Sequence, residues 1–141
     1  MTCFSQIGIV AAMLLASPVW ACTGDGGPGT DMAALDFFAK EIEDATRFDG
    51  RRPGLGIELV DLNSDGCVDV IVAFRSAFLG GARGCSTRVL NMAFDPPHEV
   101  GGMLACGVRP ASTRSAEWLD LAGDDGGRWI YSEGTYRWLE R

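Results

Sequence analysis

The chain has 141 residues, enough for one compact domain, and a formal net charge of −7. This acidic balance argues against nucleic acid as a partner, because the phosphate backbone binds basic surfaces. It argues equally against electrostatic attachment to anionic membranes.

The first 21 residues have the pattern of a secretory signal peptide. Residues 4–16 are almost wholly apolar, Ser17-Pro18 interrupts the run, and the small residue Ala21 ends the segment. We expect cleavage after Ala21, export to the periplasm or the exterior, and no integral membrane span after processing. A membrane anchor is the alternative, because an apolar run of about 20 residues can span a bilayer.

Cys22 would be the first residue of the mature chain. The run Val19-Trp20-Ala21-Cys22 resembles a bacterial lipobox, in which the cysteine receives lipid after cleavage. Trp20 departs from the small residues usual at its position. A lipid anchor at Cys22 on a membrane face is therefore an alternative to a freely exported protein.

Cleavage would leave four cysteines, Cys22, Cys67, Cys85 and Cys106. An even number in a small exported domain favours two disulfides, for which three pairings exist. Cys85 and Cys106 flank two strand-like segments joined at residues 95–98, so a hairpin would bring them together. We expect a Cys85–Cys106 bond, stabilising by about 3 kcal/mol through loop-closure entropy. A Cys22–Cys67 bond would then tie the N-terminal segment to the middle of the chain.

Residues 22–30 are glycine-rich and predict a flexible lead-in to a single domain over residues 31–141. A helix is predicted to begin at Thr30 or Asp31 and to end at residues 47–50, because apolar residues recur at spacings of three and four. Those apolar positions are Met32, Leu35, Phe38, Ile42 and Ala45.

From Leu55 onward the pattern favours strands. Residues 68–74 are nearly all β-branched or apolar, which is typical of a strand buried on both faces. Strand-like segments at residues 86–94 and 100–108 are joined by Pro96-Pro97, and shorter ones follow up to residue 139. We predict an α+β fold in which one N-terminal amphipathic helix packs on an antiparallel sheet of about five to six strands.

The run from Asp61 to Asp69 is the strongest chemical signal in the chain. Side chains with oxygen donors stand at its positions 1, 3, 5 and 9, which are Asp61, Asn63, Asp65 and Asp69, and Gly66 stands at position 6. This is the spacing of a tight turn around a hard cation such as calcium. An EF-hand is not expected, because position 12 is valine in place of glutamate and both flanks are β-like.

The loop with its strand-like flanks resembles the calcium loop of FG-GAP and VCBS repeats, the integrin-type β-propeller module. The resemblance implies that Asp61, Asn63, Asp65 and Asp69 would bind calcium through side-chain oxygens and Cys67 through its main-chain carbonyl. It covers a single copy of a short motif, whereas a propeller needs several blades.

More widely, the chain resembles small exported bacterial proteins of uncharacterised type. They combine such a loop with a Gly-Cys hairpin and a terminal Gly-x-Tyr strand, here Gly84-Cys85 and Gly134-Thr135-Tyr136. This resemblance implies an architecture and no particular activity.

The closeness of the three carboxylates in this loop supports a bound ion. Three carboxylates in one turn repel each other, unless a cation neutralises them or their pKa values rise. The alternative is a plain turn between two strands, since Asn, Asp and Gly all tolerate turn geometry. A turn alone does not require both Asp61 and Asp69. We therefore expect calcium in a structural role, bound at the concentrations found outside cells.

Other residues carry weaker signals. His98, the only histidine, follows two prolines and is expected in an exposed turn and not as a catalytic base. Trp118, Trp129 and Trp138 lie in the last predicted strands, where core and cross-strand packing is the expected role. The alternative for these tryptophans is an exposed aromatic strip that binds sugar or protein.

These observations favour an exported, non-enzymatic module that binds a protein or glycan of the cell envelope and uses calcium structurally. One alternative is an inhibitor of a cell-wall enzyme. Another is a hydrolase that uses a carboxylate pair, Glu117 with Asp120 or Asp124 with Asp125.

Overall fold

The computed structural model describes residues 22, 25–27 and 29–140. The predicted signal peptide, residues 1–21, lies outside the described residues. So does part of the predicted lead-in over residues 22–30, together with the last residue of the chain.

The described chain is mostly β, with eight strands in two four-stranded antiparallel sheets. The first sheet has the order β1-β2-β3-β4 and consists of β1 (Gly54–Val60), β2 (Asp69–Arg75), β3 (Cys85–Asn91) and β4 (His98–Met103). The second has the order β5-β6-β7-β8 and consists of β5 (Arg109–Ser115), β6 (Trp118–Ala122), β7 (Arg128–Ser132) and β8 (Thr135–Trp138). Neighbouring strands in each sheet are also consecutive in the chain, so each connection leads to the adjacent strand.

Helices cover only a small part of the described chain. Where one helix was predicted, there are α1 (Thr30–Phe37) and α2 (Ala39–Asp49), separated at Phe38, whose ψ of 15° departs from helical geometry. Two short elements, α3 (Ala77–Gly80) and the 3-10 turn η1 (Gly81–Arg83), lie between β2 and β3. None of the helices among the described residues is long and apolar enough to span a membrane.

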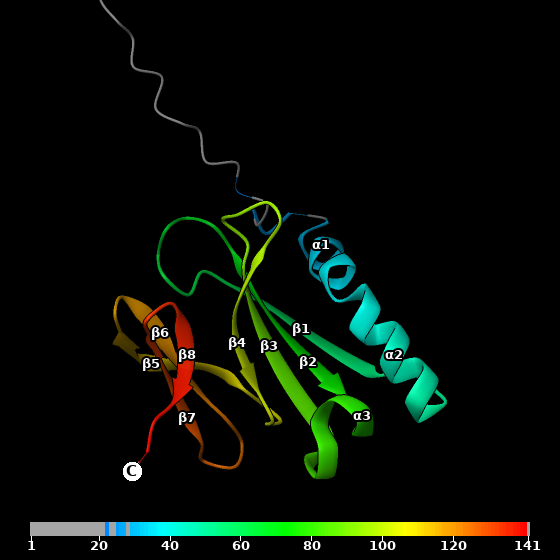
Figure 1. Ribbon diagram of the computed structural model, residues 1–141. Helices are drawn as coiled ribbons and strands as arrows, with labels where there is room; N and C mark the ends of the chain where they lie inside the picture. The colour runs from blue at the N-terminus through cyan, green and yellow to red at the C-terminus, as the bar shows by residue number, and fades with distance from the viewer. Residues whose placement is uncertain (1–21, 23–24, 28, 141) are drawn as a thin grey trace, which may run out of the picture.

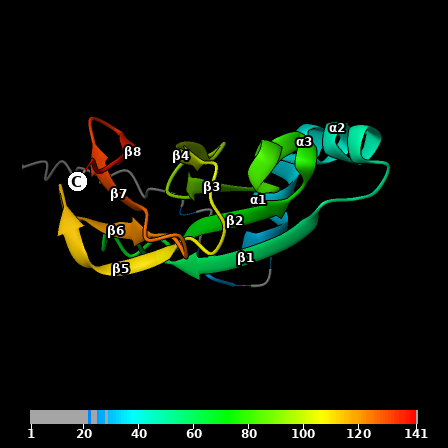
Figure 2. The same ribbon diagram turned by 90° about the horizontal axis from the view of Figure 1, so that it is seen from below.

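The layers follow from the alternation of side chains along β2. Val70, Val72 and Phe74 face α1 and α2, where Phe38 is almost fully buried against Phe74. Ile71 points to the opposite side and joins residues of the second sheet in another core cluster. The helices therefore cover one face of the first sheet, and the second sheet lies on the other side (Figure 1). Seen from below, β5 to β8 gather at one end of the molecule and α2 and α3 at the other (Figure 2).

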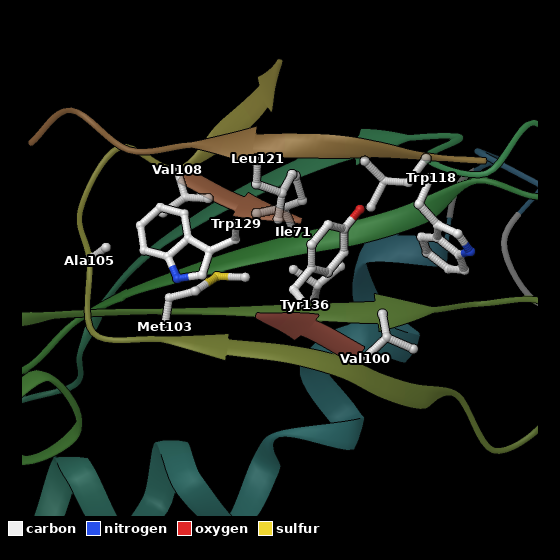
Figure 3. Close-up of a cluster of buried hydrophobic side chains, with 11 residues drawn as sticks. Ile71, Val100, Met103, Ala105, Val108, Trp118, Leu121, Trp129 and Tyr136 are labelled. Carbon is white, nitrogen blue, oxygen red and sulfur yellow. The ribbon is translucent and has the colours of Figure 1, made fainter. Parts of the chain in front are cut away.

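The core between the sheets is rich in aromatic side chains. Trp118, Trp129 and Tyr136 come from the second sheet and pack with Val100 and Met103 of the first (Figure 3). The indole of Trp129 points toward Met103. These contacts bury two of the three tryptophans of the second sheet, at 8% exposure for Trp118 and 7% for Trp129.

The predicted fold class is therefore wrong: the chain does not pack one helix on a single sheet of about five to six strands. The expected strand over residues 100–108 ends at Met103, and β5 begins at Arg109. Its sequence, RPASTRS, has no apolar alternation, because β5 is an edge strand with mostly exposed side chains. Hydrophobic periodicity reports burial, so it did not reveal β5 or the division into two sheets.

Both expected disulfides are present, Cys22–Cys67 and Cys85–Cys106. Cys85 begins β3 and Cys106 follows β4, so the β3–β4 hairpin brings them together as predicted. The first bond attaches the N-terminal segment to the loop between β1 and β2.

Gly80 offers a test of how tightly α3 packs on β3. A Cβ atom at Gly80 would lie 2.2 Å from the backbone nitrogen of Cys85, a contact that backbone atoms must move to relieve. We expect Gly80→Ala to lower the free energy of unfolding by about 1–3 kcal/mol, measured by urea denaturation. Gly56→Ala is the control, since its Cβ would meet only the Cβ of Ala73 at 3.6 Å. Equal stability of the two variants would contradict this packing.

Candidate functional site

The acidic loop, residues 61–68, joins β1 to β2 and is attached to the rest of the fold at three points. Leu62 is fully buried in the core between the sheets, and its carbonyl accepts a hydrogen bond from the backbone N–H of Leu119 at 2.8 Å. Arg114 of β5 donates from Nη2 to the hydroxyl of Ser64 at 3.0 Å. Cys67 supplies the third attachment through its disulfide to Cys22.

Within the loop, carboxylates accept hydrogen bonds from the loop's own backbone. The Asp61 carboxylate accepts from the N–H groups of Asp65 at 3.2 Å and Gly66 at 3.0 Å. Asp65 accepts from the N–H of Cys67 at 2.7 Å and from the amide nitrogen of Asn63 at 3.0 Å. Gly66 has a φ of 85°, a conformation that glycine adopts without strain. The structure thus brings Asp61, Asn63 and Asp65 together in one turn.

Asp69, the first residue of β2, lies beneath this turn and is fully buried. Its Oδ2 accepts from the N–H of Leu62 at 2.9 Å, whereas its Oδ1 has no hydrogen-bond partner among the described residues. Burial raises the pKa of Asp69 to about 7, and the negative charges of Asp65 and Asp61 contribute in the same direction. The backbone N–H groups of Leu62 and Met92 oppose that rise without cancelling it.

The fit of this loop to a hard cation is mixed. In the part of the chain that the structure describes, no three His, Cys, Asp or Glu side chains converge closely enough to hold a metal ion. The unpartnered Oδ1 of buried Asp69 is nevertheless the kind of oxygen that calcium binds, and Asp61 and Asp65 lie near enough to raise the pKa of Asp69. The oxygens of Asp61 accept from backbone N–H groups, and those of Asp65 accept from the N–H of Cys67 and the side chain of Asn63, so a cation would replace some of these bonds.

One carboxylate pair of the hydrolase alternative, Asp124 with Asp125, forms ion pairs with arginines. Asp124 forms an ion pair with Arg109 and Asp125 one with Arg83, both at 2.6 Å. These two carboxylates are therefore held by different arginines.

The other proposed pair is divided between the surface and the interior. Glu117 is exposed in the turn between β5 and β6, with a φ of 67°. Asp120 is buried in β6 and accepts a hydrogen bond from Thr113. His98 is exposed and stacks on Phe94, with ring centroids 4.1 Å apart.

Two buried features escaped sequence reasoning. Asp120 has an Oδ1 with no hydrogen-bond partner in the described chain, and it shares a strand face with Trp118. A carboxylate two residues from a tryptophan in an alternating strand was the available signal. Leu62, an apolar residue inside an acidic turn, was a comparable signal that the loop is anchored in a core.

The three tryptophans divide between the two expected roles. Trp118 and Trp129 lie in the core, as cross-strand packing predicts, whereas Trp138 at the end of β8 keeps 54% of its surface exposed. Trp138 therefore remains a candidate for binding.

No family model, no curated protein and no solved structure matches this chain.

Asp69 predicts an unusual pH dependence for the protein in chelator. Because the pKa of Asp69 is near 7 in the folded state and near 4 in the unfolded state, the folded state binds more protons between these values. Stability should therefore fall as the pH rises from about 4 to 7, by up to about 4 kcal/mol. Urea denaturation of the metal-free protein across this pH range measures the effect.

Asp69→Asn should remove most of that pH dependence, because its side chain does not ionise. Asp124→Asn is the matched control, since Asp124 is an exposed acid in another turn. Parallel stability profiles for wild type and Asp69→Asn would contradict the assignment.

Proposed function

We propose that the mature chain is an exported, non-enzymatic binding module whose acidic loop holds a structural calcium ion. Its exposed surface binds a protein or glycan of the cell envelope. The observation that carries the calcium proposal is the buried carboxylate of Asp69, whose Oδ1 has no hydrogen-bond partner among the described residues. A buried carboxylate with one oxygen outside any hydrogen bond is costly to ionise, and a bound cation would offset that cost.

The ligands in this proposal are the side chains of Asp61, Asn63, Asp65 and Asp69 and the main-chain carbonyl of Cys67. The position of the loop gives such an ion a structural task. The loop is attached to the second sheet through Leu62 and to the N-terminal segment through Cys67. An ion held there would link β1, β2 and those two attachments, so its binding energy would add to the stability of the folded state.

The two disulfides indicate an oxidising compartment, since such bonds are rare in the cytosol. This supports export to the periplasm or the exterior. One sulfur atom forms either a disulfide or a thioether to lipid, so a chain with the Cys22–Cys67 bond carries no thioether-linked lipid at Cys22.

We therefore expect the exported protein to begin at Cys22 and to carry two disulfides and no acyl chains. Intact-mass spectrometry before and after reduction and alkylation tests this directly. A mass increment equal to acyl chains, together with one alkylatable thiol before reduction, would show the lipid anchor instead.

The ion pairs and hydrogen bonds of the acidic side chains support a non-enzymatic role. Asp124 and Asp125 are neutralised by arginines, and Asp120 is buried under Thr113. Hydrolysis by a carboxylate pair needs two acidic side chains on either side of a bound substrate. Residues arranged in this way favour binding over hydrolysis.

Calcium should raise the melting temperature of the mature protein relative to chelator. For a site with a dissociation constant near 0.1 mM, 10 mM calcium stabilises by about 2.7 kcal/mol, which corresponds to a shift of roughly 10 °C. Differential scanning calorimetry with calcium or chelator measures the shift, and titration calorimetry measures binding.

Asp65→Ala should abolish this shift, because it removes a ligand from an exposed part of the loop. Asp124→Ala should preserve it, as Asp124 lies in the turn between β6 and β7. Absence of both a calcium-dependent shift and calorimetric binding in wild type would refute the calcium part of the proposal.

A further inference from the structure

A shallow hollow with a volume of about 350 Å³ lies where the two sheets meet, away from the acidic loop. It is lined by Arg83, Gly102, Met103, Leu104, Asp125, Trp129 and Trp138. Two of these, Trp138 and Leu104, are unusually exposed for large apolar side chains, at 54% and 60%. The hollow therefore combines exposed apolar side chains with a charged pair, Arg83 and Asp125.

The Trp138 indole is held in place from beneath. It packs edge-to-face on the buried ring of Trp129, with centroids 5.1 Å apart and an interplanar angle of 75°. It also lies close over Gly127, where a Cβ atom would come within 2.5 Å of the ring. A ring fixed in this way, with 54% of the residue exposed, loses little conformational entropy when a ligand covers it.

An ion pair forms the polar border of the hollow. Arg83 of η1 donates from Nη1 to Asp125 Oδ2 at 2.6 Å, and both side chains remain partly exposed, at 60% and 37%. The backbone N–H of Gly127 and the guanidinium of Arg83 lower the pKa of Asp125, which keeps it ionised. A guanidinium has five N–H donors and a carboxylate about four acceptor positions, so both keep hydrogen-bonding capacity for a ligand.

We propose that this hollow binds a neutral glycan built from pyranose rings with equatorial hydroxyl groups. The axial C–H face of one ring stacks on Trp138, and hydroxyl groups at the ring edge bind Asp125 and Arg83. Such a sugar has an apolar face beside a ring of hydroxyls, as the hollow has an indole face beside an ion pair. The inference rests on the proposed binding function and specifies its ligand and its location.

Charge and desolvation favour a neutral sugar over other occupants. The net charge of −7 disfavours polyanionic glycans, and the Arg83–Asp125 pair contributes no net charge to the hollow. An apolar peptide or a lipid chain would cover both charged groups without replacing their bonds to water, which is costly. The hydroxyl groups of a sugar would replace the bonds that both charged groups form with water.

The test uses the mature protein with cellotetraose and N-acetylchitotetraose as probes. Binding is followed by titration calorimetry and by tryptophan fluorescence, because Trp138 is the exposed member of the second sheet's three tryptophans. We expect binding of at least one probe and a loss of affinity of about tenfold or more in Trp138→Ala. Asp125→Asn and Arg83→Ala should each weaken binding by about fivefold.

Phe48→Ala is the matched control. Phe48 is an exposed aromatic residue of α2 that stacks on Phe78, far along the chain from the hollow, and its loss should leave affinity unchanged. Binding of neither sugar by wild type, or equal affinity in Trp138→Ala and wild type, would overturn the glycan proposal. Trp138-dependent binding to phosphatidylcholine vesicles in place of both sugars would also overturn it, in favour of a membrane contact.

The glycan and calcium proposals fail separately. Asp65→Ala that loses the calcium shift and still binds a sugar would leave the hollow as the working surface. A calcium shift in wild type without sugar binding would retain the structural ion and remove the glycan assignment.

Discussion

The burial of β2 on both faces is the constraint on which the rest of the structure depends. Its alternating side chains face the helices on one side and the second sheet on the other, so each layer needs the other to exclude water. Because Asp69 begins this strand, the side-chain alternation that sends Ile71 into the core between the sheets also buries a carboxylate. The raised pKa of Asp69 is therefore a consequence of strand register.

That burial connects the acidic loop to the whole fold. Leu62 enters the same core as Ile71, and its carbonyl accepts from Leu119 in the second sheet. The buried hydroxyl of Tyr136 donates to the carbonyl of Leu119 at 2.7 Å, and its pKa is raised by burial and by the charge of Asp69. The charge of Asp69, at the start of β2, thus affects the pKa of Tyr136 in β8, on the other side of the core. A cation bound by the loop would therefore stabilise the contact between the two sheets.

The hollow at Trp138 lies at a different contact between the two sheets. Arg83 comes from the connection between β2 and β3, and Asp125 from the turn between β6 and β7, so the two are 42 residues apart in the chain. The Cys85–Cys106 disulfide holds the start of β3 near the segment that leads into β5. The two proposals therefore concern separate places: the calcium site lies at the start of β2, and the glycan site lies at the border of the two sheets.

The sequence by itself determined the features that depend on local pattern. These include the buried strand after residue 68, helical structure between residues 30 and 49 and the turn of the acidic loop. The sequence also predicted both disulfides, which the structure contains, although three pairings of the four cysteines were open. Only the tertiary structure decided that there are two sheets, because edge strand β5 has almost no apolar alternation to announce it. It also decided which tryptophan is exposed. All three lie in similar strand-like segments, but Trp118 and Trp129 enter the core between the sheets and Trp138 does not. Local pattern records which residues avoid water, whereas contacts between distant segments determine what they meet.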